Sequence, residues 1–96
     1  MPRLVILPAA RADMIEIGDF IARDNPGRAL SFLAESEAKM SQAAEAPASL
    51  PARDDVHKGL RSARHGRYLI FFLDDGEDVQ IVRVLHGSRD LPRMFR

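Results

Sequence analysis

The C-terminal strand of the sequence ends in a polar segment whose side chains could do chemistry. In the stretch IVRVLHGSRD, residues 81–90, an apolar strand is followed directly by histidine, glycine, serine, arginine and aspartate. A histidine can move a proton, and an arginine can stabilise a developing negative charge. Three interpretations compete for this segment: an active site containing His86 and Arg89, an arm that docks on a partner, and an ordinary chain end.

Other polar side chains lack the spacing that metal binding or catalysis requires. The histidines are expected on a loop, a turn and a strand end, without the helical spacing of metal ligands, and they are His57, His65 and His86. Three acids of the first predicted helix are expected to form a solvated face: Asp13, Glu16 and Asp19. The sequence contains no Ser-His-Asp arrangement and no glycine-rich phosphate loop. We therefore expect no metal site and no cofactor.

Three arginines recur at intervals of three residues before the central strand, and they are Arg61, Arg64 and Arg67. In a twisted hairpin this spacing either gathers the side chains into a basic patch or scatters them. The sequence leaves both arrangements open.

The N-terminal half predicts one strand and two helices. The apolar run RLVIL, residues 3–7, favours a short buried strand, and from Ala9 onward the apolar period changes from two to about 3.6. Asn25 followed by Pro26 matches a helix N-cap with proline in the first turn, so a second helix is expected from there to about Ala46. The proline-containing stretch 46–55 is expected to be a surface loop.

The C-terminal half predicts an antiparallel meander. The three strand signals are KGLRSAR, RYLIFFL and VQIVRVLH, with tight turns at His65-Gly66 and Asp75-Gly76. Gly87 is expected to turn the chain out of the sheet. The whole chain, residues 1–96, is therefore expected to be one α+β domain of order β-α-α-β-β-β, with a helical hairpin packed on a small antiparallel sheet.

Both faces of this sheet are apolar, where a half-exposed sheet would alternate apolar and polar residues. The central strand presents Tyr68, Ile70 and Phe72 on one face and Leu69, Phe71 and Leu73 on the other. Strict alternation in the last strand would set Val79, Ile81 and Leu85 against Val82 and Val84. A helical hairpin covers one face, and loops, the C-terminal tail or another polypeptide must cover the other. We infer a partner chain.

Composition limits the class of protein. The chain of 96 residues has no cysteine, zero formal net charge and no apolar run long enough to span a membrane, which favours a cytoplasmic protein. Residues 1–56 carry six Lys/Arg against nine Asp/Glu, or −3, and residues 57–96 carry eight against five, or +3. This asymmetry predicts one acidic and one basic surface.

The order of motifs resembles the ParE branch of the RelE/ParE toxin superfamily, the toxic halves of bacterial type II toxin-antitoxin pairs. The resemblance rests on LPAARADMIEIGDFIARDNPGRALSF, GLRSARHGRYLIFFL and IVRVLHGSRD, which cover nearly the whole chain. It implies two helices packed on an antiparallel sheet.

The superfamily contains two activities, and the residues favour one of them. RelE-like members are ribosome-dependent mRNA interferases, and in that alternative Arg89 and His86 would be catalytic. Tyr68 stands where the resemblance implies a central-strand arginine, and Phe95 lies near the expected C-terminal tyrosine. Since phenylalanine cannot move a proton, the resemblance favours a ParE-like protein with no catalytic residues.

A ParE-like protein is expected to inhibit DNA gyrase, to act in plasmid stabilisation and to be neutralised by a cognate ParD-like antitoxin in a hetero-oligomer. Contact with DNA is expected only through gyrase or the antitoxin. The expected target-binding residues are Arg83, His86, Arg89 and Arg93, and the expected antitoxin-binding residues are Tyr68, Ile70 and Phe72. A third alternative is an inactive toxin that serves only as the antitoxin's partner in a regulatory complex.

Overall fold

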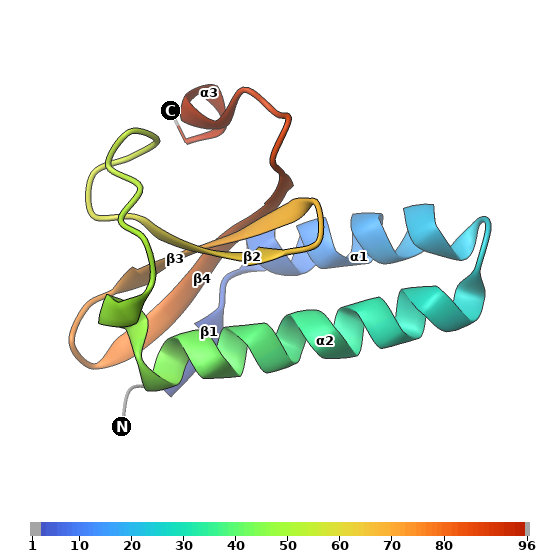
Figure 1. Ribbon diagram of the computed structural model, residues 1–96, viewed down its shortest axis with the longest axis horizontal. Helices are drawn as coiled ribbons and strands as arrows, with labels where there is room; N and C mark the ends of the chain where they lie inside the picture. The colour runs from blue at the N-terminus through green and yellow to red at the C-terminus, as the bar shows by residue number, and fades with distance from the viewer. Residues whose placement is uncertain (1–2, 96) are drawn as a thin grey trace.

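The computed structural model describes residues 3–95 and confirms the predicted α+β fold. The strands are β1 (Arg3–Ile6), β2 (Arg61–His65), β3 (Tyr68–Asp74) and β4 (Asp78–His86). The helices are α1 (Pro8–Ala22), α2 (Pro26–Glu45), the 3-10 turn η1 (Pro47–Ser49) and the short α3 (Leu91–Met94). Helices α1 and α2 lie side by side along one face of the sheet, and α3 lies on the other (Figure 1). Within residues 3–95, no helix is long and apolar enough to cross a membrane.

The sheet has the order β1-β4-β3-β2 and is mixed. Strands β2, β3 and β4 form the predicted antiparallel meander, with Gly66 and Gly76 at positive φ in its two turns. Strand β1 pairs with β4 in parallel. The helical hairpin returns the chain to the end of the sheet at which β1 begins, so β2 runs parallel to β1. Strand β4 has the same direction as β2, because the antiparallel β3 lies between them. Gly87 follows the end of β4 as predicted, but its φ is not positive, so the turn there does not require a glycine.

The helix boundaries follow from local chemistry. Pro8 occupies the first turn of α1, one residue before the predicted start. The side chain of Asn25 accepts a hydrogen bond of 3.0 Å from the backbone N–H of Arg28, which confirms the predicted N-cap of α2. Gly18 lets the two helices approach closely, because a Cβ atom there would lie 3.0 Å from a methyl group of Leu33.

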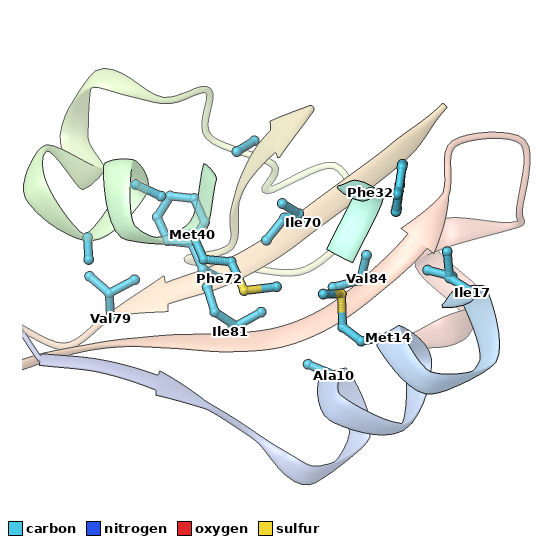
Figure 2. Close-up of a cluster of buried hydrophobic side chains, with 13 residues drawn as sticks. Ala10, Met14, Ile17, Phe32, Met40, Ile70, Phe72, Val79, Ile81 and Val84 are labelled. Carbon is cyan, nitrogen blue, oxygen red and sulfur yellow. The ribbon is translucent and has the colours of Figure 1, made fainter. Parts of the chain in front are cut away.

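The larger core lies between the sheet and the helical hairpin (Figure 2). Met14 of α1 and Met40 of α2 pack over Ile70 and Phe72 of β3, and the last three of these four are completely buried. We call this side of the sheet the helix face.

The opposite side, which we call the tail face, is covered by the chain itself. Its buried side chains come from the sheet, from the segment 51–60 and from the tail, and they are Val56, Leu60, Leu69, Phe71, Leu85 and Leu91. Phe95 packs edge-on against Phe71, with ring centroids 5.1 Å apart. The inference that a partner chain must cover this face is therefore wrong, because the loop and the C-terminal tail fold over it.

A β-bulge in the last strand changes which face of the sheet its later side chains point to. Phe71 pairs with Arg83 while Phe72 pairs with Ile81, so β4 carries one extra residue at this point. As a result Val84 joins Ile81 in the helix-face core, and Leu85 packs in the tail-face core. The predicted strict alternation, which set Leu85 with Ile81, fails because the bulge reverses the side-chain order beyond it.

Candidate functional site

A cleft of about 620 Å³ lies between helix α1 and the C-terminal end of β4. Helix α1 contributes four side chains from one side, and Arg23 follows at its C-cap; the four are Asp13, Glu16, Ile17 and Phe20. The sheet and the segments at its end contribute Arg67, Tyr68, Arg83, Val84, Leu85, His86 and Arg89. The cleft therefore brings together three of the four predicted target-binding residues.

Arg83 is part of the wall of the cleft and is held by α1. Its guanidinium donates two hydrogen bonds to the carboxylate of Asp13, at 2.8 and 2.9 Å. These bonds, together with the charge of Asp13, raise the pKa of Arg83 above its ordinary value against the opposing effect of partial burial. Arg83 therefore has a structural role in joining β4 to α1, and its role in target binding stays a prediction.

The same carboxylate completes the backbone pairing of β4. Strand β1 ends at Ile6, so the edge of β4 beyond Ile81 has no neighbouring strand on that side. Asp13 accepts a hydrogen bond of 2.9 Å from the backbone N–H of Val84 on this open edge. Asp13 was predicted to be solvated, but its side chain is only 12% exposed, because it joins α1 to β4.

His86 is fixed by its neighbours at the end of β4. The backbone N–H of Ser88 donates to Nδ1 of His86 at 3.1 Å, and the Ser88 hydroxyl lies 2.7 Å from the same nitrogen. Since a backbone N–H can only donate, Nδ1 is the acceptor, and in the neutral ring the proton is on Nε2. The ring of His86 also packs edge-on against its cross-strand partner Tyr68, with centroids 5.4 Å apart.

Three exposed arginines line the cleft from different segments. Arg23 follows the end of α1, Arg67 lies in the turn before β3, and Arg89 lies in the turn after β4. The backbone joins the last two segments, since the N–H of Gly87 donates to the carbonyl of Arg67 at 2.9 Å. Arg93, the remaining predicted target-binding residue, is exposed on α3 and does not line the cleft.

The three arginines of the predicted basic patch are scattered. Arg61 donates to the backbone carbonyl of Leu50 at 2.6 Å and fastens the loop to β2. Arg64 lines a shallow groove beside α2, and Arg67 lines the cleft. They are scattered because Arg61 and Arg64 are three residues apart in one strand, and an odd number of residues places two side chains on opposite faces of a strand.

The predicted antitoxin-binding trio is divided between core and cleft. Ile70 and Phe72 are fully buried beneath the helices, so they do not form a contact surface in this fold. Tyr68 is half-buried, and it lines the cleft. The prediction is wrong for Ile70 and Phe72, because it assigned them to the uncovered face of the sheet, and the helices lie on that face.

His65 is a packing residue. Its ring stacks on Phe32 with centroids 4.2 Å apart, and its nitrogens lie 2.8 Å from the Ser36 hydroxyl and 3.0 Å from a Glu35 carboxylate oxygen. The hydrogen bond from Arg28, followed by that from His65, holds the pKa of Glu35 below its usual range. These contacts join β2 to α2. Among residues 3–95, no three potential metal ligands lie close enough to form a site.

The contribution of α1 to the cleft was missed at the sequence level. The signal was present, because Asp13, Glu16, Phe20 and Arg23 recur at helical spacing. Phe20 interrupts an otherwise polar face and is 63% exposed in the structure. The signal was therefore the helical spacing of these side chains together with the exposed aromatic ring among them.

The sequence from residue 4 to residue 91 matches the family model described as the ParE toxin of the type II toxin-antitoxin system, parDE. The chain belongs to the ParE toxin family. The match covers most of the chain and includes α1, α2, the sheet from Leu4 onward and all the residues that line the cleft. The resemblance noted in the sequence is thereby confirmed.

A solved structure shares the fold of this toxin. It is described as the chromosomal ParDE TA system from P. aeruginosa, and it matches with a TM-score of 0.77 over 90% of this chain and 96% of the other. The two sequences are 20% identical, so the likeness shows the fold alone. No curated protein sequence is significantly similar to this one.

Proposed function

We propose that this toxin binds DNA gyrase and inhibits supercoiling without catalysing a reaction. Membership of the ParE family supports a toxin, and the geometry of His86 supports an action by binding. A general base needs an unprotonated nitrogen directed at its substrate. In His86 that nitrogen is Nδ1, which already accepts from the Ser88 backbone within the chain.

Phe95 supports the same proposal. In the mRNA-interferase alternative a C-terminal side chain near this position takes part in proton transfer. Here Phe95 has no exchangeable proton, and its ring packs against Phe71 on the tail face, away from the residues that line the cleft. We infer that Arg89 and His86 bind a target and are not an acid-base pair.

A ParD-like antitoxin is the proposed neutralising partner. The solved structure with this fold is described as a ParDE system, which supports an antitoxin that binds the toxin fold. In the described part of the chain, the large apolar side chains that are most exposed all lie on α1 and α2: Ile15, Phe20 and Leu30. We propose that the antitoxin covers the helical hairpin, since apolar area exposed in the free toxin would be buried on binding.

The gyrase proposal is tested with the toxin freed from its antitoxin. Relaxed plasmid is incubated with gyrase, ATP and increasing toxin, and translation-dependent mRNA cleavage is scored on the same preparation. The proposal predicts loss of supercoiling with intact mRNA. Cleaved mRNA with normal supercoiling would contradict it and would make Arg89 and His86 catalytic. If neither activity is detected, the gyrase proposal is also wrong and the chain is an inactive partner of the antitoxin.

The antitoxin proposal is tested by Leu30→Ser, which alters a side chain that is 74% exposed and should therefore leave the toxin folded. We expect antitoxin affinity to fall about tenfold, since most of one leucine side chain would no longer be buried in the complex. The matched control is Arg93→Ser on the opposite side of the molecule. Equal affinities for the two variants would contradict a contact at the hairpin.

A further inference from the structure

We propose that the cleft between α1 and the end of β4 binds an unpaired nucleotide of a nucleic-acid strand, with its phosphates on the arginines and its base against Phe20. The proposal does not depend on gyrase, since it concerns a ligand that the toxin would bind on its own. It goes beyond the expectation that DNA is contacted only indirectly.

The charge of the cleft favours a phosphate group. Four arginines line it against two carboxylates, and one of these carboxylates, Asp13, is already neutralised by Arg83. Arg23, Arg67 and Arg89 therefore face a single opposing charge, that of Glu16. Exposed guanidinium groups bind phosphate oxygens through paired N–H donors.

Two uncharged groups add to this surface. Because Nδ1 of His86 accepts from Ser88, its Nε2–H is left to donate to a ligand, and a neutral donor suits a phosphate or sugar oxygen. Tyr68 packs edge-on against the His86 ring and completes that wall of the cleft. A combination of aromatic and basic groups of this kind is the usual surface for single-stranded nucleic acid.

Phe20 gives the cleft a flat apolar platform. It lies one helical turn from Arg23 on the same side of α1, and most of its ring is open to solvent. The other two large apolar side chains exposed in the described chain are aliphatic, and neither Ile15 nor Leu30 lines the cleft. A nucleotide base stacks on an exposed aromatic ring, and such stacking does not depend on the base sequence.

The cleft volume and the combination of groups favour a nucleotide over an acidic peptide. A volume of about 620 Å³ falls within the range of sites that hold one small organic ligand. An acidic peptide would satisfy the arginines, but its carboxylates would leave the Phe20 ring in water. A nucleotide uses both, since it joins a planar base to a charged phosphate.

The experiment measures binding of a fluorescein-labelled oligothymidine of about eight nucleotides to the full chain by anisotropy, at several salt concentrations. Single-residue variants are Arg89→Gln, Arg67→Gln, Phe20→Ala and Glu16→Gln, all at exposed positions, so the fold should persist. The matched control is Arg11→Gln, an exposed arginine on α1 that does not line the cleft.

The arginine variants should weaken binding about threefold to tenfold and lower the salt slope by roughly 0.7 for each phosphate that is no longer bound. Phe20→Ala should weaken binding on the order of tenfold with the slope unchanged, since stacking is not electrostatic. Glu16→Gln should tighten binding, because it removes the remaining opposing charge, and Arg11→Gln should bind as the wild type does.

Three results would overturn the proposal. The first is no saturable binding of the oligonucleotide. The second is an equal loss of affinity for Arg11→Gln and Arg89→Gln, which would show diffuse electrostatic attraction. The third is displacement by a polyglutamate peptide of similar length at equal concentration together with no effect of Phe20→Ala, which would identify an acidic peptide as the ligand.

Discussion

Both faces of the sheet are apolar, and the chain covers them with different kinds of structure. The helix face lies under α1 and α2, whose backbones satisfy their own hydrogen bonds and which are joined to the sheet by polar contacts such as Asp13 to Arg83. The tail face lies under the irregular segment 51–60 and the four-residue helix α3. The difference indicates that the helix face carries most of the stability and that the tail face opens more easily.

The tail face is also the side that carries part of the proposed binding surface. Leu91 is buried there, and Arg89 and Arg93 are held in position by this anchor and by the half-buried Met94 and Phe95. The side chains of Arg89 and Arg93 therefore extend from a segment that is packed against the sheet.

The difference in stability between the helix face and the tail face is tested most directly at two neighbouring residues. Phe71 and Phe72 are both fully buried, but on opposite faces of the sheet. Phe72→Ala should lower the free energy of unfolding by about 4 kcal/mol, because the helices above it cannot collapse into the cavity. Phe71→Ala should cost about 1–2 kcal/mol less, because the loop and tail can relax. Urea denaturation measures both, and equal costs would break the comparison.

Removing the carboxylate of Asp13 should lower the free energy of unfolding by somewhat less than Phe72→Ala does. Asp13→Ala leaves Arg83 without its partner and the Val84 N–H unpaired, so we expect the free energy of unfolding to fall by about 2–3 kcal/mol. The matched pair on the tail face joins Arg53 to Asp55, two residues apart, at 3.1 Å. Because Asp55 is exposed, Asp55→Ala should cost a small fraction of the Asp13 value. A larger cost for Asp55→Ala would contradict the comparison.

A smaller effect is expected for the anchor of the tail. Leu91→Ala should cost about 2 kcal/mol, at the low end for a buried leucine, because α3 is short and can shift. Hydrogen exchange should rise in the segment 51–60 and in the tail while β3 stays protected. The exposed neighbour Arg93→Ala should change stability by no more than about 0.5 kcal/mol. Uniform exchange across both faces would show that the tail face does not open separately.

The smallest effect concerns the ionisation of Glu35, which joins α2 to β2 on the helix face. Its pKa is lowered by Arg28 first and then by His65, so its contribution to stability is present above about pH 4.3 and is lost as the pH falls through the lower folded-state value. An NMR titration of the carboxyl carbon should show this lowered pKa. Arg28→Gln should move it back upward, whereas Arg11→Gln should leave it unchanged. An unshifted pKa in the wild type would show that the contact does not form in solution.

The elements of the fold were predictable because each is encoded by neighbouring residues. The Asn25-Pro26 cap, the glycine turns of the meander and the helical period of α1 all operate within a few positions of the chain. The parallel pairing of β1 was not predicted, since it depends on where two helices return the chain. The bulge in β4 was not predicted either, because its sequence reads as an uninterrupted strand.

The site was predictable in part for the same reason. His86 and Arg89 were singled out because one ends a strand and the other lies just beyond it, and both line the cleft. Arg83 was assigned to the target because its partner, Asp13, lies 70 positions away and reads as a solvated acid. The role of the tail as a cover depends on which face the helices occupy, and the two faces of the central strand are equally apolar.

The central proposal is that the toxin inhibits gyrase by binding it, and the simplest form of this proposal is one toxin molecule for each gyrase site. The most direct test titrates a fixed amount of gyrase, well above the dissociation constant, with toxin and records the supercoiling rate. The account predicts a linear loss of activity that ends when toxin and gyrase sites are equal in number, with no further loss over time. Progressive inactivation by a small fraction of that amount would contradict it, because only a catalyst can act repeatedly.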